Sequence, residues 1–191
     1  MLSPDYPIRT ERLSLRPYQP DDFVRALDYW SRDDLTRYLY LPSFDRETFG
    51  PRMDELMQRT RLEAEGDVLT LAIVPDGVGY VVGDVTLMWH SDVHKSGEIG
   101  FLLHSEHQGK GYAHEASVPL LRIGFEQLGL HRIAGRLDGR NSASGKVLAG
   151  LGMRQEAHLV ENEWVKGEWT DEIVYAMLES EWRSGGRPTR D

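Results

Sequence analysis

The sequence predicts an α+β fold in which a mixed β-sheet carries helices on both faces. Strand-like and helix-like runs alternate along the chain, a glycine-containing loop joins a strand to a helix near its centre, and 40% of the 191 residues are apolar. That apolar content is enough for one full hydrophobic core. Since no Ser-, Gly- or Pro-rich linker interrupts the chain, we expect one domain over residues 1–183 and a flexible C-terminal tail over 184–191.

Hydrophobic periodicity places the predicted elements in one order. Strands are predicted over 8–16, 68–74, 80–89, 98–104, 131–138, 155–165 and 172–178, and helices after Pro20, over 46–62, over 112–128 and after Asn141. The order is therefore one strand, two helices, a β-hairpin and then βαβαββ. Parallel pairing at the two crossovers, with hairpins elsewhere, predicts a mixed, mostly antiparallel sheet with a central parallel pair.

Local patterns justify the N-terminal elements. Polar residues alternate with leucines over 8–16, as in a half-buried strand that ends at Pro17. Pro20-Asp21-Asp22 starts a short amphipathic helix, because proline and acidic residues favour a first turn. Over 46–62, apolar residues recur on one side of a second helix. The aromatic and leucine-rich run over 38–44 fits either core packing or a pocket wall, and we favour packing with partial exposure.

The central elements are a hairpin, a strand and a long helix. Runs over 68–74 and 80–89 are rich in β-branched and apolar residues and flank a Pro-Asp-Gly turn, which predicts a β-hairpin. The strand over 98–104 leads directly into the glycine-containing loop. The helix over 112–128 should bend at Pro119, because proline lacks the N–H that would bond the carbonyl four residues earlier.

The C-terminal elements have clear start and stop signals. The run over 131–138 alternates as a strand does, and Asn141 then stands where a helix N-cap belongs, with Ser144 at the third helical position. Gly152 is a natural left-handed stop for this short helix. Two further strand-like runs, joined across a Lys166-Gly167 turn, complete the predicted sheet.

Composition narrows the classes of function. The chain has 31 acidic and 22 basic residues, a net charge of −9, which argues against a general nucleic-acid binder and is compatible with a cationic partner. Without cysteine it has neither disulfides nor a thiolate nucleophile. Because no apolar segment is long enough for export or membrane spanning, we expect a cytoplasmic protein. His104 and His107 match no metal-ligand spacing, and Ser144 lacks a hydrolase elbow, so we predict neither a metal site nor a nucleophilic serine.

The loop over 107–116 has the features of a phosphate cradle. Gly109 and Gly111 let the backbone turn sharply, and the N–H groups at the start of the following helix are free to point at an anion. The P-loop pattern is absent, and the dinucleotide fingerprint fails because His114 stands where its third glycine belongs. What remains is Q-x-x-G-x-A, starting at Gln108. The alternative is a strand-to-helix turn that binds no ligand.

Together with other motifs, this loop resembles a known family. The motifs are TERLxLRP from Thr10, EIGFLL from Glu98, QGKGYAxEA from Gln108, NxxSxK from Asn141 with the LGM that follows, and EWxDxxVYAML from Glu168. In this spacing, over about residues 8–178, they resemble the GCN5-related N-acetyltransferases (GNAT), and among these the ribosomal-protein alanine and serine N-acetyltransferases (RimJ/RimL-like). The resemblance implies a single-domain GNAT fold and acetyl transfer from acetyl-CoA to a primary amine, with a protein N-terminal α-amine favoured.

The resemblance also implies where acetyl-CoA binds. In the family it lies where two adjacent parallel strands splay apart, here the strands around Phe101 and Ile133. The cofactor-binding residues carried over are the backbone of Phe101, Leu102 and Leu103 for the pantetheine, the N–H groups of Gln108, Gly109, Lys110, Gly111, Tyr112 and Ala113 for the pyrophosphate, and Asn141, Ser144 and Lys146 at the second crossover. An extended amide chain that ends in phosphates needs unpaired strand amides and a helix N-terminus, so the physical requirement agrees.

The net charge has the wrong sign for a cofactor that carries phosphates. Lys110 in the loop, and Arg136, Arg140 and Lys146 near the second crossover, are placed to offset it locally. The alternative for each of these residues is an ordinary position on a solvated surface.

The implied chemistry is direct attack of a neutral amine on the thioester in a ternary complex, without a covalent enzyme intermediate. Many family members use a tyrosine seven residues after the asparagine of the final helix as the acid for the leaving thiolate, but here that position is Leu148. In the ribosomal-protein branch a serine in N-x-x-S does this work, so Ser144 is the candidate acid; the alternative is a capping serine bonded to its own backbone. Glu98, acting through a water, is the candidate base, with His90 or His104 as alternative relays.

Two classes of function stay open at this point. The first is an acetyl-CoA-dependent N-acetyltransferase; the second is a non-catalytic acyl-CoA-binding or sensing module, which the Leu148 departure allows. The acceptor is open between a protein α-amine, a polyamine and an aminoglycoside, because all are basic and suit an acidic pocket. Relatives commonly form homodimers, and Trp164 and Trp169 near a sheet edge predict a surface that a second copy covers.

Overall fold

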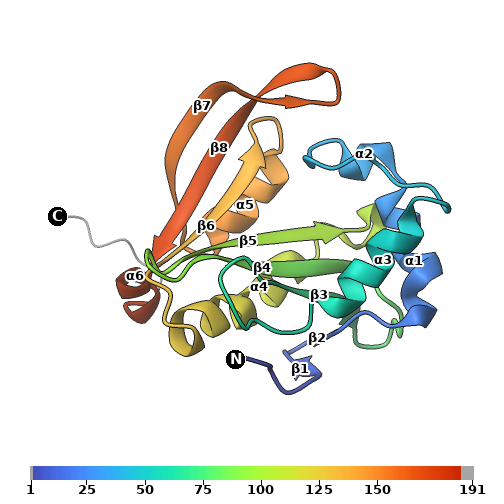
Figure 1. The fold of residues 1–191 in the computed structure, drawn as a ribbon, viewed down its shortest axis with the longest axis horizontal. Helices are drawn as coiled ribbons and strands as arrows, with labels where there is room; N and C mark the ends of the chain where they lie inside the picture. The colour runs from blue at the N-terminus through green and yellow to red at the C-terminus, as the bar shows by residue number, and fades with distance from the viewer. Residues whose placement is uncertain (1, 186–191) are drawn as a thin grey trace.

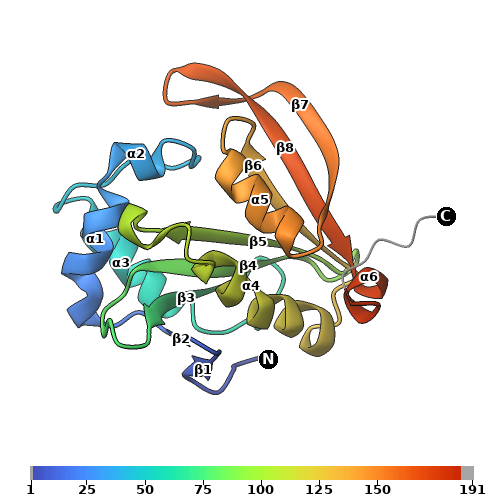
Figure 2. The ribbon, with the colours of Figure 1, turned by 180° about the vertical axis from the view of Figure 1, so that it is seen from behind.

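The computed structural model describes residues 2–185, which form one mixed sheet with helices on both faces (Figures 1 and 2). This arrangement confirms the predicted α+β class. Of the tail predicted over 184–191, only Ser184 and Gly185 lie within the described part of the chain.

The strands and helices follow nearly the predicted order. Within the described residues the sheet has eight strands, in the order β1-β2-β3-β4-β5-β6-β8-β7. The strands are β1 (Ile8–Arg9), β2 (Leu13–Arg16), β3 (Val68–Pro75), β4 (Gly83–Ser91), β5 (Ser96–Leu103), β6 (Arg132–Asp138), β7 (Arg154–Val165) and β8 (Glu168–Leu178). The helices are η1 (Pro20–Asp22), α1 (Phe23–Trp30), α2 (Asp33–Thr36), α3 (Phe49–Gln58), η2 (Ser105–His107), α4 (Tyr112–Arg122), η3 (Ile123–Gln127), α5 (Ser142–Gly150) and α6 (Glu179–Arg183). None of them is long and apolar enough to span a bilayer.

The first predicted strand, over 8–16, is in fact two strands. β1 and β2 pair antiparallel, with Ile8 opposite Leu15. A turn at Thr10 joins them, and the Leu13 N–H donates to Thr10 Oγ1 at 3.0 Å. The leucine alternation identified β2 correctly, but the turn was missed because it contains neither glycine nor proline.

Parallel pairing occurs at only one of the two predicted crossovers. β5 and β6 pair in parallel, with Gly97 opposite Ile133. β8 lies between β6 and β7 and pairs antiparallel with both, so the expected second parallel pair was wrong. The physical reason is burial: Ala176 and Met177 of β8 are fully buried, whereas most of β7 is exposed. The more apolar strand of the hairpin therefore takes the inner position.

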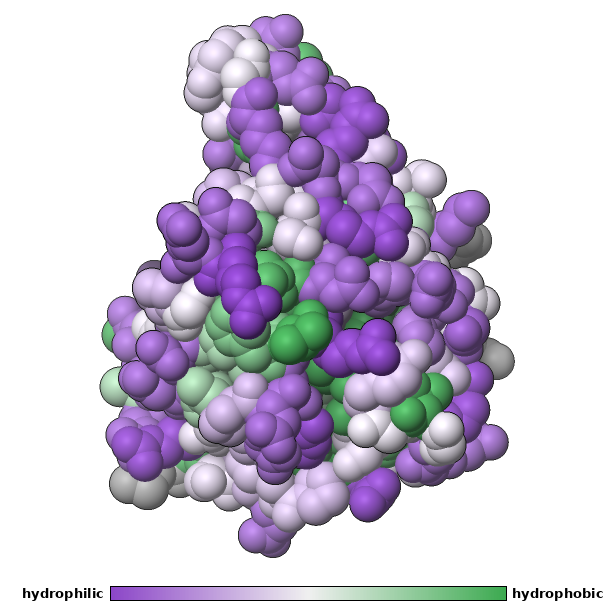
Figure 3. Space-filling model, turned by 90° about the vertical axis from the view of Figure 1, so that its right-hand side faces the viewer, coloured by the Kyte–Doolittle hydropathy of each residue, from purple (hydrophilic) through white to green (hydrophobic). Residues whose placement is uncertain are grey.

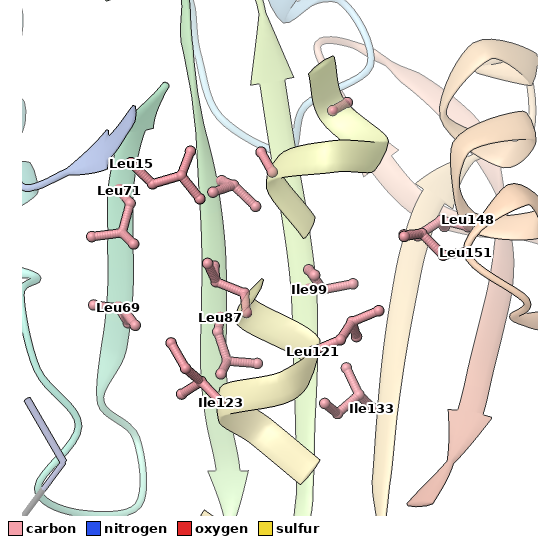
Figure 4. Packing of buried hydrophobic residues seen from close by; sticks show 14 of the residues in the cluster. Leu15, Leu69, Leu71, Leu87, Ile99, Leu121, Ile123, Ile133, Leu148 and Leu151 are labelled. Atoms are coloured by element: carbon pink, nitrogen blue, oxygen red, sulfur yellow. The ribbon is translucent and has the colours of Figure 1, made fainter. Parts of the chain in front are cut away.

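Two hydrophobic clusters lie on opposite faces of the sheet. Leu71 and Ile73 of β3 belong to the cluster beneath α4, whereas Ala72 between them packs with α1 and α3. Because successive strand side chains point to opposite faces, helices cover both faces. Figure 4 shows part of the first cluster, which includes Leu87, Ile99, Leu121, Ile123 and Ile133.

The central helix changes type near its C-terminal end. α4 continues to Arg122, and η3 is a π-helical turn in which the Leu128 N–H donates to the Ile123 carbonyl at 2.9 Å. Pro119 lies inside α4. The bend expected at Pro119 stays a prediction, since the irregular turn begins beyond it, at Ile123.

The β7–β8 hairpin extends past the rest of the sheet. β6 pairs with β8 only as far as Glu172, and residues 159–171 form an arm that projects from the body (Figures 1 and 2). At its tip, Lys166 Nζ donates to the Thr36 carbonyl at 2.6 Å, so the arm reaches back to the end of α2. Figure 3 shows the arm above an apolar patch that hydrophilic residues surround.

Candidate functional site

β5 and β6 begin as a parallel pair and then separate. The three paired positions are Ser96 with Arg132, Gly97 with Ile133 and Glu98 with Ala134. Beyond them, β5 stays paired with β4 as far as Leu103 and β6 with β8 as far as Asp138, while the two strands diverge (Figure 1). Along this open edge, from Ile99 onward, no strand of the described chain pairs with β5 on its β6 side. The predicted separation of the two parallel strands, called the splay below, is thus present. Phe101 and Leu102 lie on the β5 side of it.

The loop after β5 has the glycine geometry expected from the sequence. Gly109 and Gly111 have φ angles of 72° and 81°, in the left-handed region that glycine tolerates. Gly111 is the N-cap of α4 and has no side chain to bond the first N–H groups of the helix. Within residues 2–185, no group accepts a hydrogen bond from the N–H of Gly109, Lys110 or Gly111. Gln108 Nε2 donates to the Leu103 carbonyl at 3.0 Å and so ties the loop to β5.

Hydrogen bonds from Thr10 and Arg12, in the turn between β1 and β2, connect to the loop and to α4. This set of hydrogen bonds is called the brace below. Arg12 Nη1 donates to the Lys110 carbonyl at 3.0 Å, and Arg12 Nε donates to Glu115 Oε2 at 2.7 Å. Thr10 Oγ1 and the Arg12 N–H donate to Glu115 Oε1 at 2.7 and 2.8 Å. Burial raises the pKa of Glu115, but the Thr10 and Arg12 hydrogen bonds outweigh it and hold the pKa below its usual value. The sequence motifs that start at Thr10 and at Gln108 contain these residues. The spacing of the two motifs does not show that they meet, so the brace could not be predicted from it.

Asn141 and Ser144 occupy the predicted positions at the start of α5. Asn141 is the N-cap, and its side-chain oxygen accepts a hydrogen bond from the Ser144 N–H at 3.1 Å. The Ser144 hydroxyl has no hydrogen-bond partner among the described residues, and the side chain is half-buried. The alternative role considered for Ser144 was to cap the helix. In the structure the Asn141 side chain caps it instead.

Leu148 lies in the core. It is 2% exposed, and a Cβ added at Gly135 of β6 would lie 2.7 Å from Leu148 Cδ2. The α5 helix therefore packs closely on β6 at this position. Position 148 therefore has a buried apolar side chain where many family members have a tyrosine.

Glu98 belongs to a charged network on the face of the sheet opposite α4. Its Oε2 lies 3.1 Å from His90 Nε2 and 3.3 Å from Arg136 Nε. Arg136 Nη1 in turn lies 3.2 Å from Oε2 of Glu172, which is 1% exposed. The Tyr40 hydroxyl donates to Glu172 Oε1 at 3.5 Å, and its pKa is raised by burial and by the Glu172 charge. The network therefore crosses the splay from β4 to β8.

The two histidines considered as proton relays have different surroundings. His90 contacts Glu98 directly. His104 instead lies 3.5 Å from Asp28 of α1, between its Nε2 and Oδ2, and its Nδ1 accepts from the Glu106 N–H at 3.3 Å. The structure therefore brings His90, and not His104, to the candidate base.

The four basic residues expected near the cofactor divide into two pairs. Arg140 binds Asp138 and Glu168 at 2.7 Å each, and Arg136 is held by Glu98 and Glu172 as above. Both guanidinium groups thus have carboxylate partners inside the protein, and the expectation that they also offset a phosphate stays a prediction. Lys110 and Lys146 are exposed and form no ion pair within residues 2–185. They stay available to an anion.

The run over 38–44 combines both of the roles considered for it. Phe44 packs edge-on against Trp30, with ring centroids 5.8 Å apart, as the packing interpretation expects. Tyr40 and Leu41 are 43% and 39% exposed, and Tyr40 reaches the Glu172 network. This run therefore borders the splay as well as the core.

Comparison with known proteins agrees with this geometry. Residues 12–154 match the family model described as an acetyltransferase (GNAT) domain. The chain is 30% identical over 173 residues to the uncharacterized N-acetyltransferase p20 of Bacillus licheniformis, covering 91% of this chain and 96% of that protein. It is 29% identical over 110 residues to the spermidine N(1)-acetyltransferase of Vibrio cholerae, covering 58% of this chain and 64% of that one.

The fold also matches solved structures. The crystal structure of the ribosomal-protein-S5-alanine acetyltransferase of Vibrio fischeri superposes with a TM-score of 0.76 at 25% identity, covering 93% of this chain and 99% of that one. The splayed strands, the glycine loop and the matching family model lead to one assignment. The chain belongs to the GNAT acetyltransferase family and is an acetyl-CoA-dependent N-acetyltransferase.

Proposed function

We propose that this enzyme transfers the acetyl group of acetyl-CoA to a protein or peptide N-terminal α-amine. The observation that carries the proposal is the open β5 edge that runs into unbonded loop N–H groups. The likeness to the S5-alanine acetyltransferase of Vibrio fischeri supports the choice of acceptor. The likeness to a spermidine acetyltransferase makes a polyamine the second candidate, which the carboxylates Glu98 and Glu172 on the acceptor side favour.

The residues at the splay suit acetyl-CoA. An extended chain of amides can pair with the edge at Phe101, Leu102 and Leu103, and the loop from Gln108 to Ala113 can hold a pyrophosphate. A Cβ added at Gly109 would meet no atom within 4 Å, so an anion has free access to the backbone there. Asn141, Ser144 and Lys146 at the start of α5 complete the proposed cofactor site. When bound, acetyl-CoA supplies a thioester whose acyl carbon accepts the amine.

Two side chains take the proposed proton-transfer roles. Glu98, beside His90, receives the ammonium proton of the acceptor through a water, so that the amine attacks in its neutral form. Ser144, whose hydroxyl has no hydrogen-bond partner within residues 2–185, donates to the leaving thiolate. Neither role needs a covalent bond between enzyme and acetyl group.

Ligand protection and thiol release test the proposal together. CoA and acetyl-CoA should raise the melting temperature by mass action, while NAD and ATP should do much less. Free thiol should then appear from acetyl-CoA with peptides that begin in alanine or serine, faster than with spermidine or an aminoglycoside. Equal protection by all of the nucleotides would reject the cofactor site. Faster thiol release with spermidine would replace the proposed acceptor class.

We further propose that the arm mediates a homodimer. Trp164 and Trp169 are 60% and 58% exposed, and their ring centroids lie 5.3 Å apart. Large exposed aromatic rings on a sheet edge are surfaces that a second copy commonly covers. A monomeric mass by light scattering at working concentration would reject this assembly.

A further inference from the structure

Gly100 is a glycine that neither the backbone nor the packing of β5 requires. Its φ is outside the left-handed region, and a Cβ added there would meet no atom within 4 Å. At Gly97 and Gly83, by contrast, an added Cβ would lie 2.7 Å from the Met88 carbonyl oxygen and 2.1 Å from that of Leu102. Glycine inside a strand costs roughly 0.5–1 kcal/mol relative to alanine and often marks close approach of a ligand.

Gly100 lies in the part of β5 that borders the gap between β5 and β6. Gly100 pairs with Thr86 of β4 on one side. On the other side the last β5–β6 pair is Glu98 with Ala134, so Gly100 lies two residues into the splay. The open space therefore lies beside the edge along which the proposed function places the end of the acyl-CoA chain.

One face of the sheet at this point is closed. Ile99, Ile133 and Leu148 are at most 2% exposed and fill the space beneath α4 and α5 (Figure 4). A second substrate cannot approach from that side without displacing the core.

The other face is open and polar. The Glu98 side chain points to this face, as would a side chain at position 100, because both positions alternate with Ile99 along the strand. Across the splay stands Arg136, whose side chain is 48% exposed. An acceptor amine that comes from this face passes beside Gly100 and can reach the acyl carbon and the Glu98 carboxylate together.

We propose that Gly100 is a specificity-determining residue that leaves room for the acceptor amine and the carbon that carries it. This inference rests on the proposed function, because it takes the acyl group to lie at the splay. A methyl group at position 100 occupies space beside the carbon that carries the amine. Acceptors with a bulky substituent on that carbon are then excluded more strongly than acceptors with none.

Substitution of Gly100 by alanine tests this proposal. Gly100→Ala should fold and be protected by CoA as the unchanged enzyme is, because the added Cβ meets nothing in the protein. With a peptide that begins in alanine, its kcat/KM should fall about tenfold or more, which is the discrimination that one methyl group gives in a fitted pocket. The loss should be smallest for a peptide that begins in glycine and largest for one that begins in leucine.

Gly50→Ala is the matched control. Gly50 lies in α3, has no left-handed φ, and an added Cβ would likewise meet nothing within 4 Å. This variant should keep the kcat/KM of the unchanged enzyme with all three peptides. Equal losses for all three peptides in Gly100→Ala, or no loss, would overturn the role of Gly100. If the unchanged enzyme neither binds CoA nor acetylates any amine, it is the proposed function itself that fails.

Discussion

The hydroxyl group of Ser144 distinguishes two uses of a serine at the third position of a helix. A structural serine bonds the nearby backbone, whereas here the Asn141 side chain already accepts the hydrogen bond from the Ser144 N–H. The hydroxyl is thus left without a hydrogen-bond partner among the described residues, in the first turn of α5. Because the Ser144 hydroxyl makes none of the hydrogen bonds that hold the fold, it is available to donate a hydrogen bond in the reaction.

Ser144→Ala should lower kcat and leave stability almost unchanged. If the hydroxyl serves only the developing thiolate, its loss affects the transition state alone, so CoA affinity and KM stay nearly constant while kcat falls about tenfold to a thousandfold. Steady-state kinetics and a melting curve on one preparation measure both effects. Asn141→Ala is the control, because loss of the cap should cost about 1 kcal/mol of stability. Normal turnover in Ser144→Ala would remove the serine from the mechanism.

Glu98→Gln should have an effect that depends on pH. An amine acceptor is mostly protonated at low pH and needs a group that receives its proton, whereas at high pH it is already neutral. The loss of kcat/KM should therefore be greatest at low pH and should partly recover as the pH rises. Glu47→Gln, at an exposed position before α3, is a control that should follow the unchanged enzyme at every pH. A loss that is constant across the pH range would exclude proton transfer by Glu98.

Among the elements, the glycine loop depends on a strand turn far from it in the sequence. The turn between β1 and β2 presents Thr10 and Arg12 to Glu115 in the first helical turn of α4, and Arg12 also holds the Lys110 carbonyl. The loop backbone is therefore oriented from outside, while its own glycines supply only the freedom to turn. Loop shape and cofactor affinity should respond to a change in this brace.

Arg12→Ala should weaken CoA binding without unfolding the protein. The Lys110 carbonyl would lose its donor, and the Glu115 carboxylate would lose its charged partner, which leaves the N–H groups less well ordered. We expect the Kd for CoA to rise about tenfold, measured by calorimetric titration. Arg9→Ala is the matched control, because Arg9 pairs with Asp76 at an exposed site. Equal Kd values for the two variants would show that the brace has no part in binding.

At the scale of the whole molecule, one buried carboxyl group couples stability to pH. Asp84 of β4 is 4% exposed and accepts a hydrogen bond from the Tyr18 hydroxyl at 2.7 Å, while Tyr18 also bonds Tyr29 of α1. Burial raises the pKa of Asp84 to about 6, although the Tyr18 hydrogen bond opposes this. The folded protein therefore binds this proton more tightly than the unfolded chain does.

The sign of the resulting pH dependence follows from linkage. Because the pKa is about 6 in the folded state and 3.8 in the reference state, the Asp84 contribution to stability is largest below pH 4. This contribution is lost as the pH rises to about 6, and the free energy of unfolding falls by about 2–3 kcal/mol in total. Asp84→Asn should remove this fall, so its melting temperature relative to the unchanged protein should increase between pH 4 and pH 6.5. The exposed Asp76→Asn is the control, and parallel curves for the two variants would contradict the assignment.

The sequence predicted the local features of this molecule better than its long-range ones. Periodicity identified the strands on either side of the splay, and the positive φ at Gly111 and the cap at Asn141 followed from residue type. Periodicity shows which face of a strand is buried but not which strand lies beside it, so the insertion of β8 between β6 and β7 was missed. The Arg136 ion pairs were missed for the same reason, since a sequence does not show which charges meet.

The short contact between β5 and β6 divides the sheet into two half-sheets that share a seam of three residue pairs. Each half-sheet has its own ladder of hydrogen bonds, so each can open to solvent as a separate cooperative unit. Amide hydrogen exchange in the free enzyme should therefore show two levels of protection, one for β2 to β5 and one for β6 and β8. An extended ligand along the open edge of β5 would lengthen the seam, and the two levels would then rise and approach each other.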